Sequence, residues 1–224
     1  MKRIGMVVAV EMDALERRYG LPTSRSKGPF SVAFYKQPEY ALYALYCGAG
    51  EISAASATQH LIDVYGVDMI LNYGVVGGLV KKMELGKTVV VNGIVHYDYD
   101  VSSVDGVEKA RYADLPSRYI SPERSLVIKA QYVERSLEAV VCASGDKFVV
   151  DPAMKEMLHT EYNAEICDME AAGIALTCAR NGRPCLLIKT VSDTVSGGAD
   201  EYWANKERSA DLCLKVMDRV AKEL

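Results

Sequence analysis

The sequence predicts an α/β fold in which helices cover both faces of a central sheet. Short apolar segments bounded by turn residues recur along the chain, and longer helical patterns separate several of them. The apolar segments of the second half are almost continuous in hydrophobic residues, which is typical of strands buried on both faces. Half of the 224 residues are hydrophobic, enough for one substantial core. We therefore predict one domain that spans residues 1–224.

The expected strands extend from the N-terminus into the last third of the chain. They cover residues 4–10, 32–35, 40–47, 69–73, 88–98, 137–143, 164–167 and 185–191. The segment 102–125 is polar and has no clear period, so we expect it to lie on the surface.

The expected helices alternate with these strands and cover residues 13–19, 52–65, 122–133, 152–161, 170–181 and 200–224. Pro152 directly after Asp151 is typical of a helix start, with the aspartate as cap and the proline in the first turn. In the last helix, Leu212, Val216 and Val220 recur every four residues and so share one face. These signals place the start of the helix 152–161 and one face of the last helix.

Composition and charge exclude several classes of protein. The formal net charge of −4 argues against nucleic-acid binding. No apolar run approaches the roughly 18 residues that cross a bilayer, and residues 1–18 do not resemble a signal peptide. The cysteines are dispersed without a CxxC pair, which favours reduced core thiols in a cytoplasmic protein. The three histidines are equally dispersed, so we expect no metal site and no cofactor.

Acidic residues follow several of the expected strands at their carboxyl ends. Ligands of α/β proteins bind beyond these ends, so acids from distant segments are expected to meet there. They are Asp13, Asp146, Asp168, Glu170 and Asp193. Asp168 or Asp193 taken alone could cap the helix that follows. Glu170 is a poor cap and is costly to bury unpaired, so the convergence favours a ligand site.

Two glycine-rich segments follow strands in the first half of the chain. "CGAGEIS" opens a helix and "NYGVVGGL" ends a strand, which indicates sharp turns or close approach of backbone to a ligand. Gly48 and Gly50 resemble part of a dinucleotide fingerprint, but Ser53 stands where the third glycine would be. The segment therefore does not predict dinucleotide binding.

Together, "GAG", "NYGVVGG", "ASGDKF", "DMEAAGIA" and "VSD" resemble the nucleoside phosphorylase/nucleosidase superfamily. Within it, the chain is most similar to the 5'-methylthioadenosine/S-adenosylhomocysteine nucleosidases, over nearly its whole length. The resemblance implies a mixed central sheet flanked by helices. It also implies hydrolysis of the N-ribosidic bond of a 5'-substituted adenine nucleoside, without a cofactor.

The resemblance also assigns roles to the residues of these motifs. Asp193 matches the general acid that protonates N7 of the departing adenine, and Glu170 matches the carboxylate that holds the ribose hydroxyls. Met169 would pack on the sugar, Phe148 would stack on the base, and Val149 would offer its backbone to the base edge. Ser192 belongs to the same substrate-binding set.

A homodimer is implied as well, because members of the family build the 5'-substituent pocket with residues from both subunits. Val101 and Val104 match positions that one subunit lends to its neighbour. Trp203 matches an aromatic that lines the same pocket.

The chemistry requires acids in apolar surroundings. Adenine leaves poorly as an anion, and burial keeps a carboxyl group protonated near neutral pH so that it can supply a proton. Hydrogen bonds to the ribose diol strengthen as positive charge grows on the sugar. A further carboxylate near C1' can deprotonate water.

Three positions depart from the family pattern. Asp13 stands where a glutamate usually activates water, and Glu11 is a rival for that role. Val75 replaces a serine, and Lys189 replaces an arginine near the water site. Two alternatives to hydrolysis therefore stay open: a purine nucleoside phosphorylase that uses phosphate, and a catalytically impaired nucleoside-binding protein. We favour hydrolysis, because Glu11 and Asp13 would repel phosphate.

Overall fold

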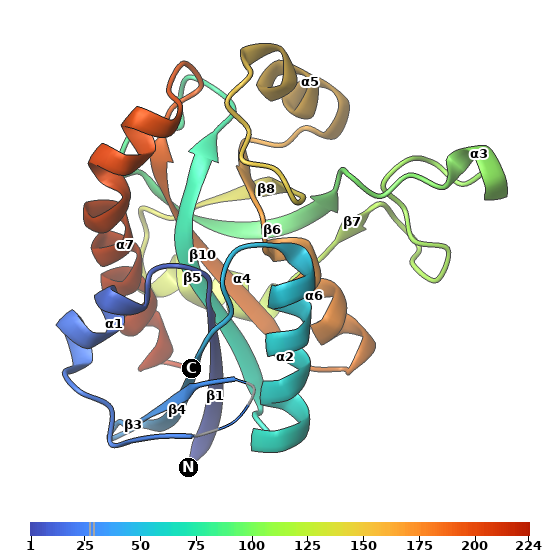
Figure 1. The fold of residues 1–224 in the computed structure, drawn as a ribbon. Helices are drawn as coiled ribbons and strands as arrows, with labels where there is room; N and C mark the ends of the chain where they lie inside the picture. The colour runs from blue at the N-terminus through green and yellow to red at the C-terminus, as the bar shows by residue number, and fades with distance from the viewer. Residues whose placement is uncertain (27, 29) are drawn as a thin grey trace.

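A mixed β-sheet forms the centre of the computed structural model, which describes residues 1–26, 28 and 30–224 (Figure 1). Its strands are β1 (Lys2–Val8), β2 (Ser24–Arg25), β3 (Val32–Lys36), β4 (Tyr40–Tyr46), β5 (Met69–Gly78), β6 (Thr88–His96), β7 (Tyr119–Ile120), β8 (Glu138–Ser144), β9 (Ile166–Asp168) and β10 (Cys185–Asp193). They are ordered β10-β6-β8-β9-β5-β1-β4-β3-β2, with β7 beside β6. Because β10 also pairs with β5, five strands close into a ring.

The strand directions bring several carboxyl ends to one edge of the sheet. Strand β1 is parallel to β4 and β5, and β5 is parallel to β10. Strand β9 is antiparallel to β5, with Cys167 opposite Gly77, so the residue after Cys167 lies near the end of β5. Segments that follow β1, β5, β9 and β10 are therefore neighbours in space.

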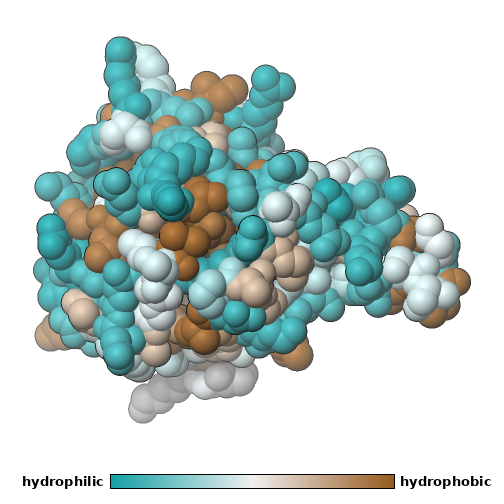
Figure 2. Space-filling view, turned by 90° about the horizontal axis from the view of Figure 1, so that it is seen from above, coloured by the Kyte–Doolittle hydropathy of each residue, from teal (hydrophilic) through white to brown (hydrophobic). Residues whose placement is uncertain are grey.

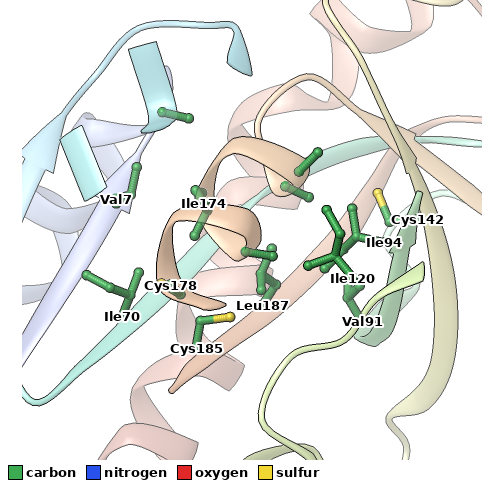
Figure 3. Close-up of a cluster of buried hydrophobic side chains, with 14 of the residues drawn as sticks. Val7, Ile70, Val91, Ile94, Ile120, Cys142, Ile174, Cys178, Cys185 and Leu187 are labelled. Carbon is green, nitrogen blue, oxygen red and sulfur yellow. The ribbon is translucent and has the colours of Figure 1, made fainter. Parts of the chain in front are cut away.

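The helices are α1 (Met12–Tyr19), α2 (Glu51–Tyr65), α3 (Ser102–Asp105), α4 (Arg124–Val133), α5 (Pro152–Tyr162), α6 (Ala171–Arg180) and α7 (Ala199–Ala221). Helices α2 and α6 pack on one face of the sheet, and α1, α4 and α7 supply the core of the other. In the first core, Ile174 and Cys178 of α6 lie against Leu187 of β10 (Figure 3). Helix α5 completes a third cluster through Leu158 and Tyr162.

The predicted fold class and its main elements are confirmed, with ends that differ by a few residues. The largest change is β5, which was expected to end at Tyr73 and continues to Gly78. The predicted start of α5 is correct, since the Asp151 carboxylate accepts a hydrogen bond from Ala153 N at 3.1 Å. The sequence did not reveal β2, β7 and α3, because elements of two to four residues are too short to show a period.

The six cysteines are free thiols, five of them buried. The five buried cysteines agree with the prediction of core thiols, and Cys47 is half-buried. That all six are reduced stays a prediction. None of the helices in the described part of the chain is long and apolar enough to cross a bilayer.

Candidate active site

A cavity of about 200 Å³ opens where β1, β5, β9 and β10 end. Figure 2 shows the molecule from above, with hydrophobic residues gathered near the middle of this face and hydrophilic residues around them. Four acidic side chains reach the cavity from segments far apart in the sequence: Glu11, Asp168, Glu170 and Asp193. Of the five acids predicted to converge, Asp168, Glu170 and Asp193 line this cavity, whereas Asp13 and Asp146 do not.

Asp193, at the end of β10, is held by two neighbours. Ser192 Oγ donates to its Oδ1 at 3.1 Å, and the ammonium of Lys155 donates to its Oδ2 at 3.2 Å. Gly77 makes room for the carboxylate, because a Cβ at this position would lie 3.1 Å from Asp193 Oδ2. Burial raises the pKa of Asp193 above its ordinary value, and Lys155 opposes that rise.

Lys155 was missed by the sequence analysis. It is completely buried on α5, and its ammonium also donates to the carbonyl oxygens of Thr194 at 2.7 Å and Gly197 at 3.2 Å. All three of its donors are thus used to fix the carboxylate and the loop that follows β10. A signal was present, since Lys155, Leu158 and Tyr162 are spaced like the buried face of a helix.

Glu170 precedes α6 and points into the cavity instead of capping the helix. Its Oε1 accepts a hydrogen bond from Gly50 N at 3.1 Å. Gly50 has a φ of 108°, and a Cβ there would approach Asp146 Oδ1 to 3.0 Å, so the contact requires glycine. Burial, followed by the charge of Asp168, raises the pKa of Glu170 to about 8.

Asp168 lies two residues before Glu170 and is neutralised by Lys189. The Lys189 ammonium lies 2.8 Å from Asp168 Oδ2, and both side chains are almost fully buried. Burial alone would raise the pKa of Asp168, but Lys189 and hydrogen bonds from Ser144 Oγ and Ala171 N hold it below its ordinary value. Lys189 therefore acts on the cavity through Asp168 and Glu170, and does not line it.

The two acids considered for water activation lie in different places. Glu11 is 5% exposed and lines the cavity, with Oε1 accepting from Val75 N at 3.2 Å and Oε2 from Val10 N at 3.0 Å. Asp13 is exposed in the first turn of α1 and is not part of the cavity lining. Glu11 precedes α1 with a non-helical backbone and Asp13 lies within the helix, so the two side chains take different directions. The structure thus brings Glu11, and not Asp13, to the site.

The remaining predicted residues divide into two groups. Met169 and Phe148 line the cavity, as do Val149, Val75 and Ser192. Trp203 is 68% exposed and lies outside it, whereas its neighbour Tyr202 lines it. Because adjacent residues of a helix point in different directions, a shift of one position exchanges the pocket residue for a surface one.

Val101 and Val104 lie outside the cavity of their own chain. They flank and form α3, which Figure 1 shows at the tip of an arm that projects from the body of the molecule. Val104 is 88% exposed. Their predicted contribution to a neighbouring subunit stays a prediction.

An α/β sheet whose strand ends gather buried acids around a cavity defines a ligand site of the type found in enzymes. The family profile described as the phosphorylase superfamily matches residues 4–224. The chain belongs to the phosphorylase superfamily, which confirms the resemblance seen in the motifs.

Comparison with individual proteins shows which members of the superfamily this chain is similar to. The chain is 34% identical over 166 residues to a 5'-methylthioadenosine/S-adenosylhomocysteine nucleosidase of Shewanella halifaxensis, covering 69% of this chain and 71% of the relative. It is 30% identical over 184 residues to an aminodeoxyfutalosine nucleosidase of Helicobacter pylori, covering 80% and 79%. A crystal structure of the Helicobacter pylori 5'-methylthioadenosine/S-adenosylhomocysteine nucleosidase with butyl-thio-DADMe-Immucillin-A superposes with a TM-score of 0.94 at 25% identity, covering 100% and 99%. The chain is accordingly an enzyme of the nucleosidase class, an N-glycosyl hydrolase.

Proposed function

We propose that this enzyme hydrolyses the N-ribosidic bond of a 5'-substituted adenine nucleoside, 5'-methylthioadenosine, S-adenosylhomocysteine or both, and releases adenine. One observation carries the proposal: Asp193 and Glu170 line the same cavity as Phe148 and Val149. A purine against Phe148 would have the Asp193 carboxyl group beside it and the Glu170 carboxyl group beside its ribose.

Asp193 is the proposed general acid. The glycosidic bond breaks more easily when N7 is protonated, because adenine then leaves as a neutral molecule. The raised pKa of Asp193 increases the fraction of the protonated form, and burial is the main cause. Lys155 and Ser192 hold the two carboxyl oxygens in place, which fixes the direction in which the proton is delivered.

Glu170 and Glu11 are the proposed sugar-binding and water-activating groups. Glu170 would accept hydrogen bonds from the ribose hydroxyls, and these bonds strengthen as the sugar becomes cationic. Met169 lines the cavity beside it and would pack on the sugar. Glu11 is a better candidate than Asp13 for water activation, because its carboxylate lies in the cavity and accepts a hydrogen bond from the Val75 N–H.

Water suits this cavity better than phosphate as nucleophile. The Val75 side chain cannot donate a hydrogen bond, and its backbone N–H is already bonded to Glu11. Lys189 is paired with Asp168 at 2.8 Å. A phosphate dianion would thus meet the Glu11 carboxylate, and Lys147 of the cavity lining is exposed and already paired with Asp98 at 3.0 Å. This favours hydrolysis over phosphorolysis.

The 5'-substituent and the oligomeric state belong to the same proposal. An aminodeoxyfutalosine nucleosidase is among the relatives, so a larger 5'-group is a second candidate substrate. The exposed α3 arm supports a homodimer in which Val101 and Val104 of one subunit complete the 5'-pocket of the other.

A substrate panel tests the proposal. The purified protein is incubated with 5'-methylthioadenosine, S-adenosylhomocysteine, aminodeoxyfutalosine, adenosine and inosine, each with and without phosphate, and the free base is measured. We expect adenine release without phosphate, fastest with a 5'-thio substituent. Release that requires phosphate would support a phosphorylase, and binding without release would support a nucleoside-binding protein.

A further inference from the structure

A buried hydroxyl group behind the active site has more partners than its single hydrogen can serve. Ser144, the last residue of β8, is fully buried. Its Oγ accepts a hydrogen bond from Ala172 N at 3.1 Å and lies 2.6 Å from Asp168 Oδ1. The same Oγ also lies within hydrogen-bonding distance of Glu51 Oε1, at the start of α2.

If both contacts are hydrogen bonds, the count of hydrogens requires a proton on one of the two acids. A serine hydroxyl has one hydrogen to donate, and Ala172 brings its own. If both carboxyl groups were ionised, one of them would face the hydroxyl oxygen without a hydrogen between them. Two buried carboxylate charges would also lie on either side of the same atom, which is strongly unfavourable. A proton on one of the acids removes both problems.

The proton belongs on Glu51, because the surroundings of the two acids differ. Asp168 has the Lys189 ammonium at 2.8 Å. Glu51 accepts a hydrogen bond from Gly173 N, but among the residues that the structure describes no Lys or Arg forms an ion pair with it. Burial and then the charge of Asp168 raise the pKa of Glu51 to about 7, in agreement with this assignment.

The position of Glu51 links this network to the site. Gly50, the preceding residue, provides the N–H that binds Glu170. The backbone N–H of Glu51 donates to Asp146 Oδ1 at 2.7 Å, and Asp146 begins the segment that reaches Phe148. The Glu51 side chain therefore anchors the start of α2 between the sugar side and the base side of the cavity.

We propose that Glu51 is a positioning residue that is held as a neutral acid: it donates a hydrogen bond to Ser144, which donates to Asp168, and it fixes the Gly50 N–H against Glu170. Loss of its proton breaks the first hydrogen bond and places a second negative charge beside Asp168. The start of α2 then shifts away from Glu170, and the enzyme loses activity. The link to activity rests on the role proposed for Glu170, whereas the protonation of Glu51 does not.

Other titratable groups surround this network, and the test must separate them from Glu51. Those that face Glu51 or the residues bonded to it are Asp146, Asp168, Glu170, Lys189, Tyr97, Tyr112, His96 and Arg180. Arg180 is exposed and paired with Asp114, and its charge does not change between pH 6 and 9. Burial raises the pKa of both tyrosines and lowers that of His96, so these three stay neutral between pH 7 and 9. The pKa of Glu170, about 8, is close to that of Glu51, about 7. Because Glu170 is present in both proteins, the ratio of the Glu51 variant to the wild type cancels its contribution.

The decisive variant is Glu51→Gln, whose amide can donate to Ser144 and accept from Gly173 N without ionising. We expect its kcat/KM for 5'-methylthioadenosine to equal that of the wild type at pH 6. Above pH 7 the wild type should fall behind, by about tenfold at pH 8 for a group with this midpoint. Glu51→Leu, which cannot donate, should lose activity at all pH values and raise KM.

Exposed Glu39→Gln is the matched control. A variant-to-wild-type ratio that stays constant from pH 6 to 9 would overturn the proposal.

Two measurements without substrate keep the proton assignment separate from the nucleosidase assignment. Infrared difference spectra should show a carboxylic acid band that titrates near pH 7 and is missing in Glu51→Gln. Because the folded-state pKa is raised above the ordinary value of 4.5, the wild type should lose stability relative to Glu51→Gln as pH rises from about 4.5 to about 7, and no further above that. A titrating band in a protein that releases no adenine would support the neutral Glu51 and overturn only the nucleosidase assignment. Absence of the band would overturn the neutral Glu51.

Discussion

At the scale of single residues, the least predictable feature was which acid reaches the site. Glu11 and Asp13 follow the same strand, and either could have entered the cavity. The choice depends on the backbone at Glu11, whose φ of −104° and ψ of 25° precede α1 and turn its side chain towards Val75. A hydrogen bond from Tyr73 Oη to the Glu11 carbonyl at 2.6 Å fixes this turn. Such long-range contacts are not visible in the sequence pattern.

Two matched variants test this assignment. Glu11→Gln removes the proposed base while keeping its shape, so kcat should fall by about 10²- to 10⁴-fold. Asp13→Asn alters an exposed charge in the same helix turn and should leave kcat within about twofold. Steady-state rates of adenine release distinguish the two. The assignment is wrong if Asp13→Asn is the more damaging change.

Lys155 leads to a prediction about pH. The protonated form of Asp193 is the proposed acid, so kcat/KM should fall as pH rises through the pKa of Asp193. The Lys155 ammonium lowers that pKa. Lys155→Met should therefore move this limb of the profile to higher pH, and the profile of kcat/KM checks it.

Stability provides the second readout for Lys155. Removing one partner of a buried ion pair costs about 3–5 kcal/mol, less here to the extent that Asp193 takes up a proton. Lys82→Met is the control, because it removes an exposed lysine that pairs with Glu138 and Glu165 on the surface. If the profile of kcat/KM against pH is the same for Lys155→Met and the wild type, Lys155 does not lower the pKa of the catalytic acid.

At the scale of elements, strands and long helices were predictable because burial imposes a period on them. The same period places Glu51 and Lys155 on buried helix faces, beside Ala54 and Leu158 respectively. A helical projection could have marked both as buried charges, but not their partners on distant strands. The close approach of β5 to β9 and β10 depends on Gly77. The three-dimensional structure reveals this dependence, and the sequence pattern does not.

Gly77→Ala tests that approach. The added Cβ would lie 3.0 Å from Cys167 Sγ and 3.1 Å from Asp193 Oδ2, so the carboxyl group must move. Since proton transfer is sensitive to small displacements, kcat should fall while the fold persists, by less than the roughly 10²-fold that a displacement of about 1 Å can cost. Gly93→Ala is the control, because its Cβ would find its nearest neighbour at 3.6 Å. Equal activity of the two variants would show that Asp193 tolerates the displacement.

At the scale of the whole molecule, the α3 arm is the part whose purpose a single chain does not explain. It carries Val104 away from the body of the protein, where an exposed valine contributes nothing to the core (Figure 1). In the proposed dimer, the arm would close the 5'-side of the partner's cavity. Val104→Asp should accordingly raise KM for 5'-methylthioadenosine much more than for adenosine, which lacks the hydrophobic substituent.

Complementation between two impaired variants tests the shared site directly. Asp193→Asn has no general acid but has an intact arm, whereas Val104→Asp has the acid and a damaged arm. If each site combines Asp193 of one subunit with the partner subunit's Val104, a heterodimer of the two variants contains one complete site. Mixing them under conditions that allow subunit exchange should restore activity towards 5'-methylthioadenosine at low substrate concentration, to at most half of the wild-type value per dimer.

Mixing Asp193→Asn with Glu170→Gln is the control. Both of these changes lie in the same chain's half of the site, next to the base and the sugar, so each heterodimer site would still lack one of the two groups. Activity that stays at the sum of the separate variants, in a sample shown to be dimeric by sedimentation, would mean that the arm serves its own chain or none.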